Sequence, residues 1–166
     1  PTTFLEKSDN RLYFPVNFRY SFGKDYFDFW SSDGTTSGTN FMNSICFPTY
    51  AFPTFEKYKN NFYLNFNNSN PPEIWHSAGT TNTTYKILES ISGKNLFNMV
   101  EFNDKGYFAI TTNNYGTELW ETDGTISGTK LTAEIRPGQP NSQINNLMNF
   151  DDKIVMSGTD GNGIAL

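Results

Sequence analysis

Short runs of apolar and aromatic residues alternate with polar turns along the whole chain. One period of this pattern holds a run at 107–111, a run through Trp120, a run at 130–135 and a run at 144–150. Breaks that contain Asn, Gly or Pro separate these runs. No window shows the i, i+3, i+4 apolar spacing of an amphipathic helix. The pattern therefore predicts an all-β chain with about four short strands per period.

Four of the turns contain Asn or Asp and lead directly into a strand-like run. They lie at 9–10, 60–61, 103–104 and 151–152. Asn and Asp tolerate the positive φ angle that a two-residue turn between antiparallel strands needs. Each of these positions is therefore predicted to be a β-hairpin.

A longer motif follows each of the first three hairpins and marks an internal repeat. Its copies lie at 29–39, 74–84 and 118–129, and the three tryptophans of the chain occur in them at intervals of 45 residues. The tryptophan is predicted to fill the space between adjacent units, the glycine to supply a positive φ angle, and the threonine to hydrogen-bond the turn to itself. The motif residues are Trp30, Asp33, Gly34, Thr35, Trp75, Gly79, Thr80, Trp120, Asp123, Gly124 and Thr125.

A four-stranded unit that repeats every 45 residues or so is typical of a β-propeller blade. Such a blade covers both faces of its sheet only by packing on its neighbours. We expect a single repeat array over 1–166, with a partial blade carrying an insertion at 1–40, blades at 41–85 and 86–130, and a partial blade at 131–166. These amount to about three and a half blades, below the four to eight of a closed propeller. The sequence thus predicts a partial propeller and a piece of a longer chain or a larger complex.

The third copy of the motif resembles the Glu-Leu-Trp-x-x-Asp-Gly-Thr-x-x-Gly-Thr repeat family from Glu118 to Thr129. This resemblance implies a β-propeller module of large secreted or surface-attached bacterial proteins, many of them exported by the type IX route. It also implies an extracellular or cell-surface location. The first copy has Asp28 and Phe29 in place of Glu-Leu, and the second has Ala78 in place of the Asp and Thr83 in place of the second Gly.

The first unit carries an insertion between its hairpin and its tryptophan. The added stretch at 17–22 is aromatic and cationic. Insertions of this kind usually map to loops on one face of a repeat array, often the binding face. A ligand-facing loop is therefore one hypothesis, and an aromatic cap on the end of the array is the other. The candidate loop residues are Arg19, Tyr20, Phe22 and Tyr26.

Composition narrows the classes of partner. The formal net charge is −5 and the sequence has no basic run, which disfavours binding to nucleic acid or to an anionic membrane. No apolar run reaches 18 residues, so we expect no membrane insertion. The single cysteine, Cys46, excludes an internal disulfide framework and is predicted to be a small buried strand residue.

No metal or cofactor site is predicted. The motif turns offer one carboxylate each, Asp33 and Asp123, and the spacing of acidic residues that forms a calcium loop is absent. The Gly-rich stretch at 159–163 falls in register with the turn before a fourth tryptophan. His76, the single histidine, is predicted to be a solvent-facing strand residue.

We predict that the chain is not an enzyme, because no motif places a nucleophile and an orienting acid beside His76. One catalytic alternative is that carboxylates of different blades meet around a propeller axis, as in a propeller glycosidase. The carboxylates near the tryptophan strand are Asp25, Asp28, Glu73 and Glu118. A sialidase-like site needs several converging arginines, and the chain has only Arg11, Arg19 and Arg136.

The favoured function is a non-catalytic structural and interaction module of a secreted or cell-surface bacterial protein, which mediates adhesion, protein or cell-envelope contacts. A lectin-like propeller that binds glycans on exposed aromatic rings is the alternative, and a glycosidase fragment comes third. Exposure separates the first two, because sugar platforms need rings that face solvent. The candidate platforms are Tyr20, Phe22, Tyr26, Tyr50 and Tyr115.

Overall fold

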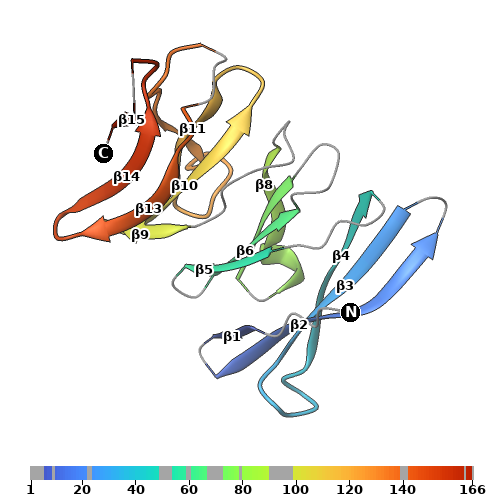
Figure 1. The fold of residues 1–166 in the computed structure, drawn as a ribbon. Helices are drawn as coiled ribbons and strands as arrows, with labels where there is room; N and C mark the ends of the chain where they lie inside the picture. The colour runs from blue at the N-terminus through green and yellow to red at the C-terminus, as the bar shows by residue number, and fades with distance from the viewer. Residues whose placement is uncertain are drawn as a thin grey trace.

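The chain folds into four small antiparallel β-sheets, which confirms the predicted all-β class. The computed structural model describes residues 6–8, 10–21, 24–48, 54–58, 61–66, 73–78, 80–89, 99–138, 142–162 and 164–165. Within these ranges the one helical element is the short 3₁₀ turn η1 (Thr81–Thr83). The sheets follow one another in chain order from the N-terminal to the C-terminal end of the molecule (Figure 1). Within the described residues, no strand pairing links one sheet to another.

Each sheet is a meander in which neighbouring strands are consecutive in sequence. The first sheet contains β1 (Glu6–Ser8), β2 (Arg11–Ser21), β3 (Lys24–Ser32) and β4 (Asn40–Pro48). The second contains β5 (Thr54–Tyr58), β6 (Asn61–Phe66), β7 (Glu73–Ser77) and β8 (Thr84–Glu89). The third contains β9 (Val100–Phe102), β10 (Lys105–Thr112), β11 (Gly116–Thr122) and β12 (Lys130–Ala133). The fourth contains β13 (Asn145–Phe150), β14 (Lys153–Thr159) and β15 (Ile164–Ala165).

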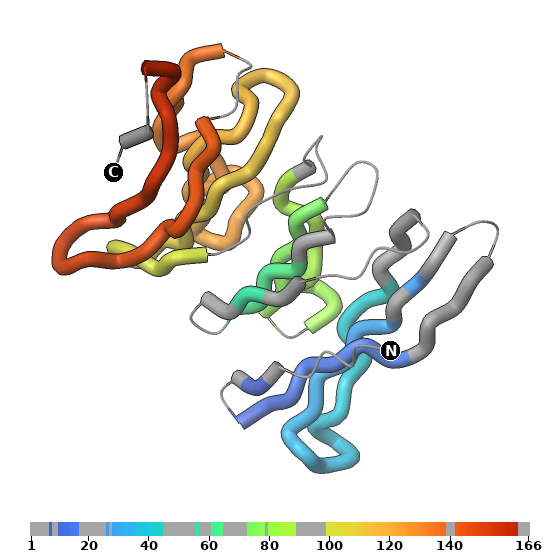
Figure 2. The backbone as a smooth tube through the Cα atoms, in the orientation of Figure 1, coloured from blue at the N-terminus to red at the C-terminus, as the bar shows by residue number. Residues whose placement is uncertain are grey.

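The sheets of the structure do not end at the predicted unit boundaries of 40, 85 and 130. The strand after each motif turn pairs with the tryptophan strand before it, as β4 does with β3, β8 with β7 and β12 with β11. The turn reverses the chain within a few residues, so the next strand lies beside the tryptophan strand and completes the same sheet. The sheets therefore span 6–48, 54–89, 100–133 and 145–165, and the first is a full four-stranded unit. The backbone trace in Figure 2 follows this succession of sheets.

The predicted hairpin turns are present wherever the structure describes them. Asn10, Asn103, Asp104 and Asp151 adopt positive φ angles between 48° and 64°. Each of these turns joins the first and second strands of its sheet. The Asn and Asp positions therefore fix where each meander begins.

The insertion in the first unit lengthens a hairpin and does not form a loop. Arg19 pairs with Tyr26 and Tyr20 with Asp25, so β2 and β3 continue to Ser21 and Lys24. Aromatic residues favour strands, which explains why this stretch extends the sheet. The backbone of Arg19, Tyr20 and Tyr26 therefore lies in strands, where the prediction placed a loop. Phe22 and the side chains of Arg19 and Tyr20 lie outside the described residues.

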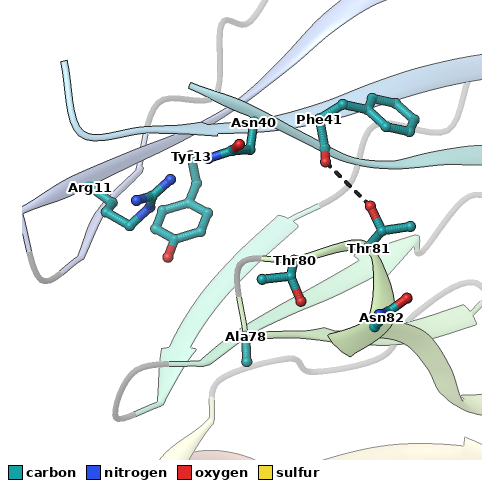
Figure 3. A pocket seen from close by; sticks show the side chains of 8 residues that line it. All are labelled: Arg11, Tyr13, Asn40, Phe41, Ala78, Thr80, Thr81 and Asn82. Carbon is teal, nitrogen blue, oxygen red and sulfur yellow. Dashed lines mark hydrogen bonds between the residues drawn. The ribbon is translucent and has the colours of Figure 1, made fainter. Parts of the chain in front are cut away.

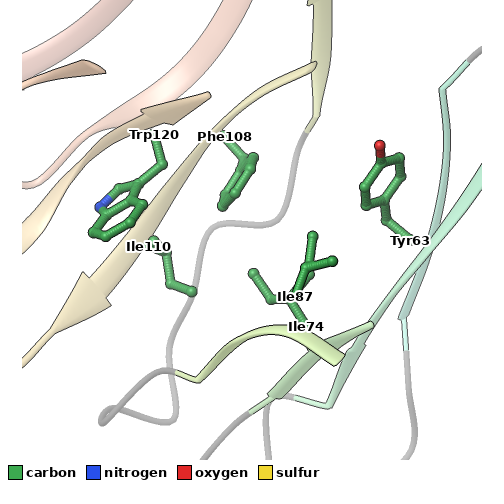
Figure 4. Packing of buried hydrophobic residues seen from close by; sticks show 6 residues of the cluster. All are labelled: Tyr63, Ile74, Ile87, Phe108, Ile110 and Trp120. Atoms are coloured by element: carbon green, nitrogen blue, oxygen red, sulfur yellow. The ribbon is translucent and has the colours of Figure 1, made fainter. Parts of the chain in front are cut away.

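Three layers of buried apolar side chains lie between the four sheets. The first layer is Tyr13, Phe29, Met42, Phe62 and Leu64, with Trp75 against it. The second is Tyr63, Ile74, Ile87, Phe108, Ile110 and Trp120, drawn in Figure 4. The third is Ala109, Leu119, Ile144 and Leu147. Side chains alternate between the two faces of a strand, so each internal sheet contributes to the layers on both sides of it.

We call the face of a sheet on the side of the preceding sheet its backward face, and the opposite face its forward face. In the first sheet, the backward face is the one turned away from the second sheet. Tyr63 of β6 packs in the layer shared with the third sheet, whereas its neighbours Phe62 and Leu64 pack in the layer shared with the first. Trp75 and Trp120 both lie on backward faces, which confirms that these tryptophans pack between units. Trp30 lies on the backward face of the first sheet, which no described sheet covers.

Candidate functional site

The motif turn of the first copy is closed by the side chain of its aspartate. The carboxylate Oδ1 of Asp33 accepts hydrogen bonds from the backbone N–H of Thr35 at 2.9 Å and from its hydroxyl at 2.7 Å. The Thr35 hydroxyl oxygen in turn accepts the N–H of Gly38 at 2.9 Å, and the Thr39 hydroxyl donates to the Thr35 carbonyl at 2.7 Å. The hydroxyl and backbone donors of Thr35 lower the pKa of Asp33.

The third copy repeats this network almost without change. Asp123 accepts from Thr125 at 2.9 and 2.7 Å, the Thr125 hydroxyl accepts the N–H of Gly128 at 2.9 Å, and Thr129 donates to the Thr125 carbonyl at 2.6 Å. The hydroxyl and the backbone N–H of Thr125 lower the pKa of Asp123. The predicted role of the threonines in holding the turn is confirmed. Both aspartates act as acceptors inside their own turns.

The two glycines of the motif are needed for different reasons. Gly34 and Gly124 have φ angles of +91° and +95°, the left-handed region that favours glycine, as predicted. Gly38 and Gly128 are needed for space, because a Cβ built on either would lie 1.9 Å from the carboxylate of Asp33 or Asp123. The aspartate that closes the turn therefore excludes a side chain at the second glycine.

The second copy closes its turn with a different pair of side chains. Ala78 stands where the other copies have Asp, and Thr83 stands at the position of the second glycine. The Thr83 hydroxyl accepts the N–H of Thr80 at 3.1 Å and contacts the Thr80 hydroxyl at 2.8 Å. A hydroxyl thus replaces the missing carboxylate, in space that is free because no Asp is present. Gly79 lies outside the described residues.

A pair of hydroxyl residues that the sequence analysis missed joins the two ends of every turn. Each pair lies 2.6 or 2.7 Å apart and connects the end of the tryptophan strand to the start of the next strand. The signal was a Ser or Thr two residues after each tryptophan. The pairs are Ser32 with Thr39, Ser77 with Thr84, and Thr122 with Thr129.

The second and third turns also dock on the sheet before them. The Tyr85 hydroxyl of the second sheet donates to the carbonyl of Gly124 at 2.9 Å. In the same way, the Thr81 hydroxyl donates to the carbonyl of Phe41 and the Asn43 amide donates to that of Thr84, both at 3.3 Å. The turns therefore act as clamps between successive sheets.

His76 fills the contact between the second sheet and the third turn, so its predicted exposure is wrong. The side chain is 5% exposed. Its ring lies 5.4 Å from that of Tyr63 and 5.1 Å from that of Tyr85, and Nδ1–H donates to the Thr83 carbonyl at 3.2 Å. The third turn covers it, since a Cβ on Gly124 would lie 3.1 Å from Nε2. Burial lowers the pKa of His76 below 6.5.

The buried imidazole makes stability depend on pH. The pKa of His76 is lower in the folded state than in the unfolded state. The neutral imidazole therefore contributes its full stabilisation above pH 6.5, and this contribution is lost as the pH falls from there through the folded-state pKa. We expect the melting temperature to fall over this window in the wild type and to fall less in His76→Gln. Thermal unfolding followed by circular dichroism at a series of pH values checks this. Parallel profiles for the two proteins would contradict it.

A polar pocket of about 660 Å³ opens between the first sheet and the second turn (Figure 3). In the first unit, Ser31 and Asn40 stand at the positions that the larger His76 and Tyr85 occupy one repeat later. The Arg11 guanidinium in its wall donates to the Ser31 hydroxyl at 3.1 Å and to the Gly38 carbonyl at 2.6 Å. The lining residues are Arg11, Tyr13, Asn40, Phe41, Ala78, Thr80, Thr81 and Asn82.

The carboxylates considered for catalysis are engaged within their own sheets. Glu118 is fully buried and accepts the backbone N–H groups of Ile135 at 2.6 Å and Arg136 at 3.2 Å. Burial raises the pKa of Glu118, and the two N–H donors oppose that rise. Glu73 accepts from the Trp75 indole at 2.9 Å and from Lys86, and Asp28 accepts from Ser44. The side chain of Asp25 lies outside the described residues.

Few of the proposed glycan platforms fall within the described residues. Tyr115 is half-buried, with its ring 6.5 Å from that of Trp120, and packs on the second apolar layer. Tyr26 is half-buried in β3. Phe22 and Tyr50 are outside the described residues, as is the side chain of Tyr20.

In the described part of the chain, no three His, Cys, Asp or Glu side chains lie close enough to hold a metal ion. No helix in that part is long and apolar enough to cross a membrane. Cys46 lies in β4 as predicted for its backbone, and its side chain is outside the described residues.

No protein-family model, curated protein or solved structure matches this chain.

Proposed function

We propose that the chain is a non-catalytic structural and interaction module of a secreted or cell-surface bacterial protein. Its repeats are blades of the Glu-Leu-Trp-x-x-Asp-Gly-Thr-x-x-Gly-Thr family, and they form part of a β-propeller. Export by the type IX route and the extracellular location rest on the resemblance of the motif. The partners are proteins or the cell envelope, and no cofactor is involved.

The observation that carries this proposal is that the polar residues of the motif hold the scaffold together. In both complete copies the carboxylate and hydroxyl groups form the same closed network inside the turn. The tryptophans Trp75 and Trp120 pack between sheets. These hydrogen bonds and packing contacts engage most of the motif side chains within the scaffold, which supports a structural role for the motif.

The blade interpretation is supported by the shape of the repeat. Three four-stranded meanders and one three-stranded meander stack face to face through apolar layers. Within the described residues, no sheet packs on the backward face of the first sheet or on the forward face of the fourth. A propeller closes by bringing such faces together around an axis.

The two end faces are the surfaces that we propose for interaction. Leu12 and Phe41 on the backward face of the first sheet are 38% and 42% exposed, whereas Phe62, at the position of Leu12 one repeat later, is 1% exposed. Met148 and Phe150 on the forward face of the fourth sheet are 52% and 61% exposed. The occupant that fits each face is another sheet of the same repeat, because such a sheet covers the matching face elsewhere in the stack.

Sedimentation velocity over a range of concentrations tests this proposal. We expect self-association through the end faces, which Phe41→Ser and Phe150→Ser each weaken. Ile126→Ser is the matched control, because Ile126 is 63% exposed but lies on a motif turn. A protein that stays monomeric at every concentration, or that responds equally to all three substitutions, would contradict the proposed interaction surface.

A further inference from the structure

The polar pocket between the first sheet and the second turn lies inside the array, between two sheets that the structure describes. Arg11 and Tyr13 of β2 and Asn40 of β4 line it on one side, and residues of the second turn line it on the other (Figure 3). Its volume of about 660 Å³ falls in the range of about 300–1,000 Å³ that sites for small molecules occupy. The pocket is therefore large enough for a ligand.

Two side-chain amides of the lining are not used by the scaffold. Asn40 and Asn82 are exposed, and neither amide makes a hydrogen bond within the described residues. Each amide offers N–H donors and a carbonyl acceptor. Because Asn40 belongs to the first sheet and Asn82 to the second turn, the pocket offers donors and acceptors from both of its sides.

Arg11 supplies further donors in a fixed orientation. Both of its hydrogen bonds in the described part of the chain come from Nη2, to the Ser31 hydroxyl and the Gly38 carbonyl. The N–H groups of Nε and Nη1 therefore remain for a ligand. The charge of Arg11 is offset by Asp33, whose Oδ2 lies 4.0 Å from Nη1. A guanidinium that is already held in place loses little conformational freedom when a ligand binds.

The other described residues of the lining are uncharged. Ala78 replaces the Asp of the other copies, so the second turn brings no carboxylate to the pocket. Tyr13 is 5% exposed and supplies apolar surface, with its ring centroid 3.8 Å from that of Phe62. The Thr81 hydroxyl joins the two sides of the pocket through its hydrogen bond to the Phe41 carbonyl. The pocket therefore combines uncharged polar groups with a smaller apolar surface.

The repeat shows that the scaffold does not require this polar lining. One repeat later, His76 and Tyr85 take the positions of Ser31 and Asn40, and their rings lie 5.1 Å apart. The Tyr85 hydroxyl donates to the Gly124 carbonyl of the third turn. The second and third sheets thus use this place for packing, whereas the contact between the first and second sheets leaves it open and polar.

We propose that this pocket binds one ring of an uncharged saccharide. Neighbouring hydroxyl groups of a sugar both donate and accept, so they match the amides of Asn40 and Asn82 and the remaining N–H groups of Arg11. The apolar C–H face of the ring lies against Tyr13. This site goes beyond the proposed function and does not need the end faces, so sugar binding and self-association can each fail without the other.

Titration of the intact chain with simple sugars tests this inference. The probes are glucose, galactose, mannose and N-acetylglucosamine at millimolar concentrations, and amide chemical shifts report binding. We expect saturable binding of at least one of these sugars, with shifts concentrated on 11–13, 40–41 and 80–82. Inorganic phosphate is the charged comparison and should bind more weakly than that sugar, because Asp33 offsets the charge of Arg11.

Variants of the chain localise the site. Asn40→Ala and Asn82→Ala should each weaken sugar binding roughly threefold to tenfold, the effect of losing one or two hydrogen bonds. Asn40→Tyr, which introduces the residue type found one repeat later, should abolish binding. Asn114→Ala is the matched control, because Asn114 is an exposed asparagine in the turn between β10 and β11.

Circular dichroism checks that each variant folds, and the two alanine variants decide the question if Asn40→Tyr does not fold. Saturation by none of the four sugars, binding of phosphate alone, or shifts away from the pocket would overturn the proposal. Unchanged sugar affinity in both Asn40→Ala and Asn82→Ala would overturn it as well.

Discussion

Replacing Trp120 by alanine is expected to lower the free energy of unfolding by about 3–5 kcal/mol, the cost of removing a large buried side chain and leaving a cavity. Trp120 is 9% exposed and packs in the apolar layer that joins the second and third sheets. Its indole Nε1 has no hydrogen-bond partner in the described part of the chain. The contribution of Trp120 is therefore one of packing. Urea unfolding followed by circular dichroism measures the loss.

Trp30→Ala is the matched control for this prediction. Trp30 has the same place in the motif, but its face is not covered by a described sheet, and its ring contacts Phe41 at 5.7 Å between centroids. We expect a loss of about 1–2 kcal/mol, in line with partial burial. Equal losses for the two variants would mean that Trp120 does not stabilise the contact between sheets.

Gly128→Thr is expected to lower the free energy of unfolding by about 1–3 kcal/mol, the usual cost of overpacking. A Cβ at this position would lie 1.9 Å from the carboxylate of Asp123. Asp123→Ala should cost a similar amount, because it removes two hydrogen bonds to Thr125. The double variant reproduces the residue pair of the second copy, Ala78 with Thr83, and should be more stable than the sum of the single losses predicts.

A double-mutant cycle in urea measures this coupling between positions 123 and 128. We expect a coupling free energy of about 1 kcal/mol or more in favour of the double variant. The equivalent pair, Asp33 and Gly38, has the same 1.9 Å approach and should give the same sign. Additive effects in both copies would show that the aspartate is not what restricts the second glycine.

The sequence predicted the repeat and its strands well, because those features depend on local pattern. Spacing of the tryptophans identified the units, and the Asn/Asp turns located the hairpins, which only a few residue types can form. The ends of the sheets differ from the predicted unit boundaries because strand pairing is a non-local property. The stretch at 40–48 follows a turn, and its sequence is compatible with the first strand of a new sheet or with the last strand of the preceding one. Its pairing with β3 shows that it is the last strand of the first sheet.

Parts of the site could be predicted and others could not. The sequence shows that the second copy has Ala78 in place of the Asp and Thr83 in place of the second Gly. The reason why the two replacements occur together became clear only from the short distance between the glycine and the carboxylate in the other copies. His76 lies on a strand whose pattern does not reveal that the turn of the next repeat covers it.

The central claim is that successive sheets stack through the side chains of the repeat. Nuclear Overhauser contacts from the Trp120 indole test it most directly. We predict contacts to the methyl groups of Ile74 and Ile87, which belong to the sheet before. Contacts confined to residues 99–133 would contradict the stacked arrangement.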